Sequence, residues 1–205
     1  MRQKIYTSLC IIVSFFIISC TRDIDCTVTA FHERPLPQGE TIRIEPIDPA
    51  KWGSLEFKEY AAMIATQLKA VGYTPVGKGD AAELVAEIDY KIDSGKTAIT
   101  RRSSSYVRYH FYYGHYYRPY YHGLYDYWEP PFYSETVYNR SLSMNIVKAE
   151  GQKGPGRKVL FESWVLSTGR ENKLHGIMPY LVTAMFTNFP GESGVSKIIT
   201  IEKNH

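Results

Sequence analysis

The stretch LVAEIDYKI, residues 84–92, places apolar side chains at every second position. Between them lie mostly charged side chains, so that Glu87, Asp89 and Lys91 share the opposite side. A period of two is typical of a β-strand, in which successive side chains point to opposite faces. We therefore expect a strand with one face on the core and one wetter face, as is usual in antiparallel sheets.

Similar alternation predicts further strands on both sides of this one. They are expected at residues 26–32, 41–46, 138–146, 158–166 and 195–201. In the strand at 138–146, Tyr138, Leu142, Met144 and Ile146 alternate with polar residues. The Gly- and Pro-rich residues 151–156 then predict a turn, which makes 158–166 the hairpin partner of that strand.

Two stretches have the apolar spacing of amphipathic helices. The first follows Ser54, whose hydroxyl can accept a hydrogen bond from a free N–H of the first turn, and ends near Gly72. Its apolar stripe is Phe57, Tyr60, Ala61, Ile64, Ala65, Leu68 and Val71. The second stripe runs from Ile177 to Phe189, with Pro179 acceptable only in the first turn.

This order of elements predicts an α+β fold. Two helical stripes need a sheet face against which to bury themselves. We expect a two-layer sandwich: a mainly antiparallel sheet with two helices on one face and a long Tyr/His-rich insert between two strands. The length suits a single domain, which we place at residues 27–205.

The N-terminal residues 1–19 have the features of a signal peptide. Arg2 and Lys4 precede an apolar run that is too short to span a bilayer comfortably as a helix. The run ends in Ile17-Ile18-Ser19-Cys20, which resembles the lipobox of bacterial lipoproteins. That resemblance implies cleavage before Cys20 and acylation of its thiol, with residues 20–26 as a lipidated tether. Cys10 and Cys26 do not fit the pattern.

The anchor gives the expected location. Several acyl chains would hold the protein at a membrane permanently. Thr21 replaces the Asp that resembles an inner-membrane retention signal, so we expect the outer membrane, facing the periplasm. An ordinary signal peptide and an uncleaved anchor are the alternatives.

Charge and cysteine content exclude some classes of protein. The whole chain has a formal net charge of +3, and loss of Arg2 and Lys4 leaves 22 basic against 21 acidic residues. Such a balance does not favour a nucleic-acid partner. With Cys20 acylated, Cys26 has no partner for an internal disulfide, and we interpret it as a tolerated cysteine of the tether.

Residues 103–135 differ in composition from the rest of the chain. Eleven of the 17 tyrosines lie between Tyr106 and Tyr133, interleaved with three histidines and interrupted by prolines. No period of 2 or 3.6 is visible, so the segment reads as the long tip of a hairpin or an irregular loop. A loop of this length is usually functional or disordered.

Three interpretations of this insert remain open. It is a low-complexity loop that packs on its own sheet, or an aromatic contact surface for sugars, peptidoglycan, headgroups or a protein. The third is metal or haem capture by the histidines, but their spacing is not that of a tight site. We therefore expect no metal site and no cofactor. The candidate binding residues are Tyr109, His110, Tyr112, Tyr113, His115, Tyr116, Tyr117, Tyr120, Tyr121, His122 and Trp128.

The sequence contains no convincing catalytic motif. Gly191-Glu192-Ser193-Gly194 superficially resembles a serine-protease loop, but it follows a helix stop and is read as a turn. There is no nucleophile elbow, phosphate-binding loop or zinc-protease motif. Asp89 and Asp93 need no acid–base role. Glu162 and Trp164 share a strand face, which suits either a sugar platform or an ordinary cross-strand pair.

The order of landmarks along the chain resembles one known family. The landmarks are Thr29-Ala30-Phe31-His32, Pro37-x-Gly39-x-Thr41-Ile42, Ser54-Leu55-Glu56, Gly72-Tyr73, Ser167-Thr168-Gly169, Met178-Pro179-Tyr180-Leu181 and Phe186-x-x-Phe189-Pro190-Gly191-x-x-Gly194. Together they resemble the domain-of-unknown-function 4136 family of bacterial envelope lipoproteins. The resemblance implies an envelope location and an α+β fold, and it implies no catalytic residues.

The functional expectation is a non-enzymatic, lipid-anchored envelope protein. It would act as a structural or adaptor protein and present the aromatic insert to another envelope component, an envelope protein or peptidoglycan. The alternatives are a periplasmic binding module for a sugar or metal, acting through the insert, and third, a hydrolase.

Overall fold

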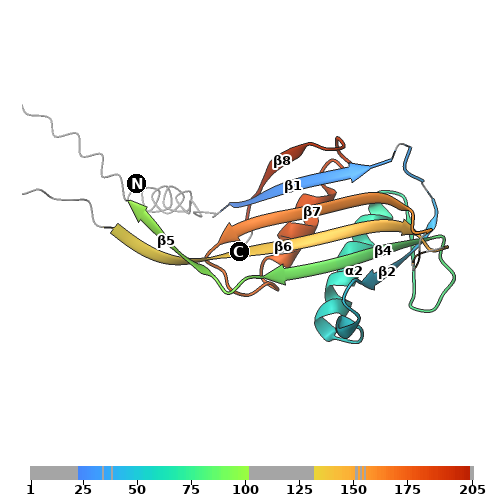
Figure 1. Cartoon of the computed structure of the whole chain (residues 1–205), viewed down its shortest axis with the longest axis horizontal. Helices are drawn as coiled ribbons and strands as arrows, with labels where there is room; N and C mark the ends of the chain where they lie inside the picture. The colour runs from blue at the N-terminus through green and yellow to red at the C-terminus, as the bar shows by residue number, and fades with distance from the viewer. Residues whose placement is uncertain are drawn as a thin grey trace, which may run out of the picture.

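A computed structural model describes residues 23–33, 35–37, 39–101, 132–150, 152, 154 and 156–203, and side chains are not described at 100, 101, 132 and 133. Within this part the sheet has eight strands, and seven follow the order β3-β2-β4-β6-β7-β1-β8 while β5 pairs with β6 (Figure 1). The pairs β2–β3 and β2–β4 are parallel, and the other pairs are antiparallel. The mainly antiparallel α+β fold is confirmed.

The strands occupy the expected places, with changes at their ends. They are β1 Ile24–His32, β2 Thr41–Pro46, β3 Thr74–Val76, β4 Leu84–Ile92, β5 Lys96–Arg101, β6 Phe132–Lys148, β7 Val159–Gly169 and β8 Ser196–Ile201. β3 and β5 were not predicted. β6 begins inside the segment that the sequence assigned to the insert, so residues 132–135 belong to a strand.

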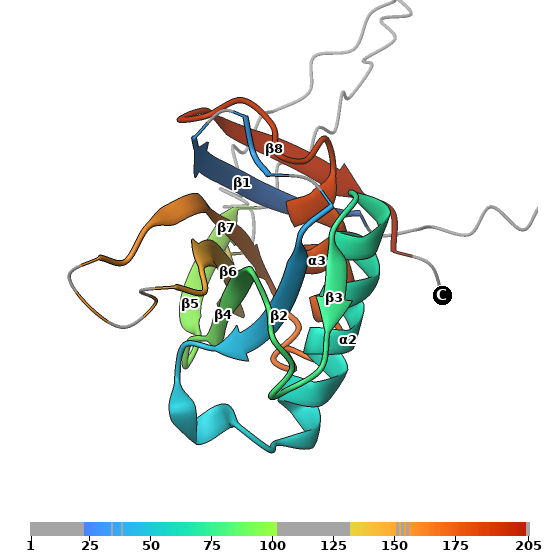
Figure 2. The ribbon, with the colours of Figure 1, turned by 90° about the vertical axis from the view of Figure 1, so that its right-hand side faces the viewer.

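The helices are α2, Leu55–Ala70, and α3, Met178–Phe186, and a 3-10 turn, η1, covers Pro49–Lys51. The predicted cap of α2 is present, since Ser54 Oγ accepts a hydrogen bond from the Phe57 N–H at 3.0 Å. Both helices lie on the same side of the sheet (Figure 2), and they contact each other. Among the described residues, no helix combines the length and the apolar character needed to cross a bilayer.

The core lies between the two helices and the inner face of the sheet. β4 contributes Leu84, Ala86, Ile88 and Tyr90 to it, the alternating positions that the sequence indicated. The Tyr60 ring of α2 meets Tyr90 edge to face with ring centroids 4.9 Å apart. The same alternation places Glu87 and Asp89 on the outer face, which no helix covers in Figure 2.

One boundary of the sequence interpretation is wrong. Residues 20–26 were assigned to a tether, but β1 begins at Ile24 and Cys26 is fully buried in it. Cys26 pairs with Ser167 of β7 and Ile199 of β8, so it is a core residue of a central strand. Residues Ile24 to Cys26 therefore belong to the sheet, and the domain boundary at Thr27 is too late.

Candidate functional site

A two-stranded arm extends the sheet at one end. β6 continues beyond Tyr138, where β7 ends, and its residues 132–137 pair only with β5 among the described strands. We call β5 together with residues 132–137 the arm. Six strand residues span about 20 Å. The aromatic insert leaves the arm after Arg101 and returns at Phe132.

The arm and the start of β1 lie at the same end of the sheet (Figure 1). The register shows this independently, because Arg140 pairs with Ser167, and Ser167 pairs with Cys26. Ile24 is therefore among the outermost residues of β1 at that end, which we call the arm end. The opposite end, with the turn between β6 and β7, is the turn end.

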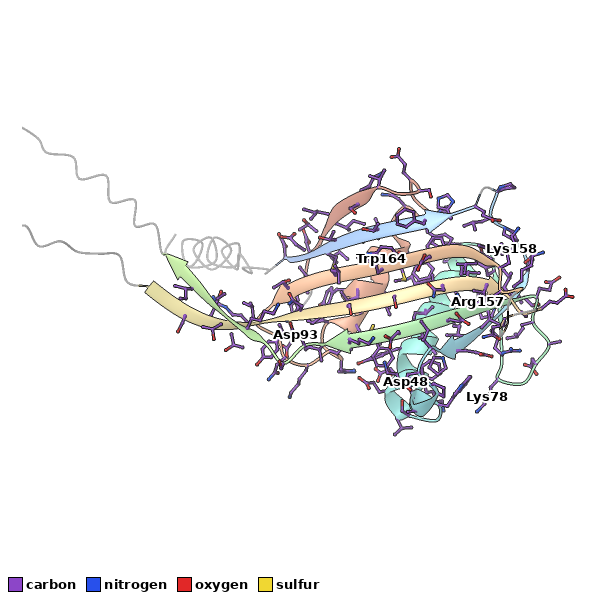
Figure 3. The ribbon with its side chains drawn as sticks, viewed as in Figure 1. Asp48, Lys78, Asp93, Arg157, Lys158 and Trp164 are labelled. Carbon is purple, nitrogen blue, oxygen red and sulfur yellow. The ribbon has the colours of Figure 1, made fainter. Side chains whose placement is uncertain are left out.

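The base of the arm is held by Asp93. Its Oδ1 accepts hydrogen bonds from the N–H groups of Gly95 and Asn139, both at 3.0 Å, and its Oδ2 accepts one from Asn139 Nδ2 at 2.8 Å. The backbone hydrogen bond from Asn139 is the main reason why the pKa of Asp93 lies below its ordinary value. Gly95 has a φ of +84°, which favours glycine at this bend. Asp93, labelled in Figure 3, thus orients the arm.

The eleven aromatic and histidine residues proposed as a binding surface lie outside the described residues, as does Cys20. The structure therefore neither brings them together nor separates them. Within the described residues there is no cluster of three or more His, Cys, Asp or Glu side chains able to hold a metal ion.

The outer face of the sheet carries an aromatic pair. The rings of Phe31 and Trp164 lie 5.7 Å apart and tilted by 32°. Trp164 lies on the broad face that Figure 3 turns toward the viewer, between Thr29 and Ser143 of the neighbouring strands. Leu166 and Ile198, which is 74% exposed, continue the apolar surface. An aromatic ring among hydroxyl groups suits the face of a sugar ring.

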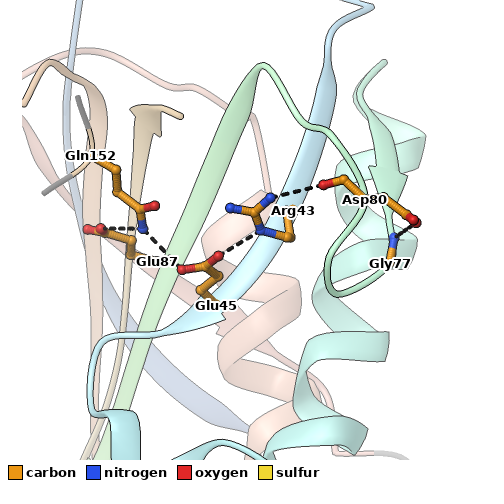
Figure 4. A network of polar contacts seen from close by, with 6 residues as sticks. All are labelled: Arg43, Glu45, Gly77, Asp80, Glu87 and Gln152. Atoms are coloured by element: carbon orange, nitrogen blue, oxygen red, sulfur yellow. Dashed lines mark hydrogen bonds and ion pairs between the residues drawn. The ribbon is translucent and has the colours of Figure 1, made fainter. Parts of the chain in front are cut away.

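At the turn end the outer face carries a network of paired charges. Gln152 Nε2 donates to Glu45 Oε2 and to Glu87 Oε1, each at 3.1 Å. Arg43 binds Glu45 at 2.7 Å, and Arg157 binds Glu87 at 2.6 Å. Figure 4 shows how this network joins β2, β4 and the β6–β7 turn. Glu45 and Glu87 thus each bind an arginine and accept a hydrogen bond from the Gln152 amide.

Asp89 also binds cations and so stabilises the fold. Its two oxygens bind Lys51 at 2.7 Å and Lys91 at 2.8 Å. Burial raises the pKa of Asp89, but hydrogen bonds from Lys51 and then Lys91 outweigh it, so the pKa lies below the ordinary value. Lys51 also lies over the Tyr90 ring, 3.9 Å from its centroid. These contacts tie η1 to β4.

The serine of the Gly191–Gly194 segment contacts backbone. Ser193 Oγ accepts a hydrogen bond from the main-chain N–H of His32 at 3.1 Å. The Gly194 N–H in turn donates to Ala30 O at 2.8 Å. Both bonds fasten the turn before β8 to β1, in keeping with the interpretation of this segment as a turn.

One buried charged residue was missed by the sequence analysis. Arg140 occupies the inner register of β6, with Leu142 and Met144, and is only 3% exposed. A signal was available, because position 140 falls on the apolar side of the alternation at 138–146. A charged residue there breaks the expected pattern and requires a partner.

Comparison with known proteins gives a family and distant structural neighbours. Residues 30–191 match the sequence profile of the domain of unknown function DUF4136. No curated protein matches the sequence significantly.

Three solved structures are similar at low identity. A PDZ domain protein from Parabacteroides distasonis ATCC 8503 gives a TM-score of 0.49 at 13% identity, over 95% of this chain and 42% of that one, so this chain spans less than half of that protein. A DUF4136 family protein from Bacteroides thetaiotaomicron VPI-5482 gives a TM-score of 0.41 at 16% identity. The match covers 80% of this chain and 95% of that one. A PelC dodecamer from Paraburkholderia phytofirmans gives a TM-score of 0.37 at 11% identity. The match covers 78% of this chain and 92% of that one. Because the DUF4136 profile matches most residues of the chain, the chain belongs to the DUF4136 family.

Proposed function

We propose that the protein is a lipid-anchored, non-catalytic component of the bacterial cell envelope, at the periplasmic side of the outer membrane. It would present its aromatic insert to another component at the same membrane surface. The observation that carries the proposal is that the arm and the start of β1 lie at one end of the sheet. An acylated Cys20 would hold this end, and not the turn end, near the bilayer.

The lengths support contact at the membrane surface. Only Thr21 and Arg22 separate Cys20 from Asp23, so the Cα atoms of Cys20 and Asp23 are at most about 11 Å apart. The arm extends the sheet by about 20 Å at the same end. The insert therefore begins at or beyond the level of the anchor. Tyrosine and tryptophan prefer the boundary between lipid and water, so the composition of the insert suits this position.

The contact is tested by pull-down from detergent-solubilised membranes. The test variant replaces residues 102–131 by a short Gly/Ser linker, which keeps β5 and β6. The control variant shortens the β6–β7 turn at residues 151–156, at the opposite end. We expect loss of partners only in the test variant. The same partners in both variants would contradict the proposal.

The anchor is tested separately. Mass spectrometry of the mature protein should find a diacylated or triacylated Cys20 at the N-terminus, and Cys20→Ser should release the protein from the membrane fraction. An unmodified residue 20 in a soluble protein would contradict the location.

A second candidate function is sugar binding at the outer face. Phe31 and Trp164 support it, since their rings pair on the outer face beside Thr29 and Ser143, with Phe31 exposed and Trp164 half-buried. We expect Trp164→Ala to abolish binding to peptidoglycan fragments and Trp52→Ala, on the η1 side, to leave it unchanged. Equal binding by both variants would rule out this surface.

A further inference from the structure

A cavity of about 920 Å³ opens at the arm end of the sheet. It is lined by the start of β1, the end of β7 with the loop after it, the residue before α3, and Lys203, which follows β8. Arg140 is part of its wall. The cavity thus lies on the helix side of the sheet, beside the residues that follow the proposed anchor.

The Arg140 guanidinium has no anionic partner within ion-pair distance in the described part of the chain. Its Nη2 donates to Ser167 Oγ at 3.1 Å, and its Nε is buried without any hydrogen-bond partner there. The Ser167 hydroxyl is itself engaged, since it donates to the Asp25 carbonyl oxygen at 2.9 Å. Burial lowers the pKa of Arg140 from its ordinary value, but the guanidinium stays charged. The charge of Glu171 favours the protonated guanidinium without forming an ion pair with it. A buried arginine without an ion pair is costly.

No acidic residue that lines the cavity forms an ion pair with Arg140, although the Glu171 carboxylate acts on its charge from a greater distance. Asp25 Oδ1 accepts a hydrogen bond from Thr200 Oγ1 at 2.7 Å, and Glu171 Oε1 accepts one from the Lys173 N–H at 3.2 Å. Asp23 is exposed at the rim. Arg170 pairs with Glu135 of the arm, so Lys203 and Arg140 are the cavity's remaining cations.

Gly169 keeps space for the guanidinium. A Cβ at position 169 would lie 2.8 Å from Arg140 Nη2 and 3.4 Å from Cζ. The backbone of β7 therefore passes directly beside the planar group. An arginine held in place with an unused N–H is preorganised for an oxyanion, which its fork of donors binds well.

We propose that this cavity binds a phosphate-type oxyanion, with Arg140 as the principal ligand and Lys203 at the rim. Two sources share this chemistry: a soluble phosphate, and the phosphodiester of an anionic phospholipid. The site itself does not depend on the proposed function. The lipid source does, because only an acylated Cys20 would hold the cavity close to headgroups.

The first measurement uses the chain as isolated from membranes in a maltoside detergent, titrated with inorganic phosphate at constant ionic strength by calorimetry. We expect Arg140→Gln to weaken binding by at least about tenfold, the effect of losing one charge-assisted contact. Arg140→Lys, which keeps the charge but not the fork, should bind with intermediate affinity. Arg157→Gln, at the turn end, is the matched control and should change affinity less than about twofold.

The second measurement follows phosphatidylglycerol, and diacylglycerol with the same chains, by native mass spectrometry. Arg140-dependent retention of phosphatidylglycerol alone identifies a lipid source, and Arg140-dependent binding of phosphate alone identifies a soluble one. If neither probe binds, or if Arg140→Gln and Arg157→Gln change binding equally, any bound phosphate is an adventitious ion only and the proposal is wrong. Lipidation of Cys20, measured separately, is unaffected by that result.

Discussion

Arginines at the two ends of the sheet differ in how their charges are paired. At the turn end, Arg157 and Arg43 each bind a carboxylate on the outer face, and Gln152 bridges the two acids. At the arm end, Arg140 is the more deeply buried arginine but has only Ser167 as a described hydrogen-bond partner. Paired charges hold a fold together, whereas an unpaired buried charge at a cavity is prepared for a ligand. This difference is the reason for proposing an anion site at the arm end.

The largest expected effect comes from a matched pair of glycines. Gly169→Ala places a Cβ against the Arg140 guanidinium, whereas Gly154→Ala, at the turn end, meets nothing within 4 Å. We expect Gly169→Ala to lower the free energy of unfolding by about 1–3 kcal/mol, as overpacking does. Gly154→Ala should change it by less than about 0.5 kcal/mol. Urea denaturation followed by tryptophan fluorescence measures both; equal effects would mean that Arg140 moves freely.

Replacing the arginines themselves sharpens the contrast. In buffer without phosphate or sulfate, Arg140→Met removes an uncompensated buried charge and should raise the free energy of unfolding by about 1–2 kcal/mol. Arg157→Met breaks a half-exposed pair with Glu87 and should lower it by up to about 1 kcal/mol. Thermal unfolding of both variants gives the sign of the change in stability. A destabilised Arg140→Met would indicate that an internal partner already compensates the charge.

The Asp89 pair gives a smaller, pH-dependent effect. The folded pKa of Asp89 lies below its unfolded value of about 3.9, so its contribution is complete above that pH and is lost as the pH falls through the folded pKa. Lys51→Met removes a main cause of the depressed pKa. We expect Lys51→Met to lower the free energy of unfolding by about 1 kcal/mol at pH 6 and by less at pH 3. Lys91→Met, which removes a more exposed partner, is the control and should have less effect at both pH values.

The smallest change expected is in the chemistry of Cys26. Burial raises the pKa of its thiol, although Ser167 and Arg140 oppose this. Because the unfolded thiol ionises at lower pH than the folded one, Cys26 stabilises the fold below about pH 8.5 and loses that contribution as the pH rises. Alkylation by iodoacetamide at pH 8 should be slow in the native protein and fast in urea. Rapid native alkylation would show that the β1 end of the cavity opens.

Local sequence patterns were sufficient for the interior of the sheet and the first helix. The alternation in residues 84–92 predicted β4 and its two faces, and Ser54 predicted the start of α2. The patterns were insufficient where pairing partners decide the structure. β5 was missed because Lys96–Arg101 has little apolar content, and it is a strand because it pairs with β6. Cys26 was assigned to the tether although it opened the expected strand at 26–32, and the structure buries it between two neighbouring strands.

The sequence by itself determined the fold class, the family landmarks and the composition of the insert, since these depend on residue order alone. Only the tertiary structure decided that the arm and the start of β1 share one end of the sheet, and that Arg140, Ser167 and Cys26 form one row across β6, β7 and β1. The physical reason is that strand register brings together residues far apart in the chain. No local periodicity specifies which charge will be buried beside which partner.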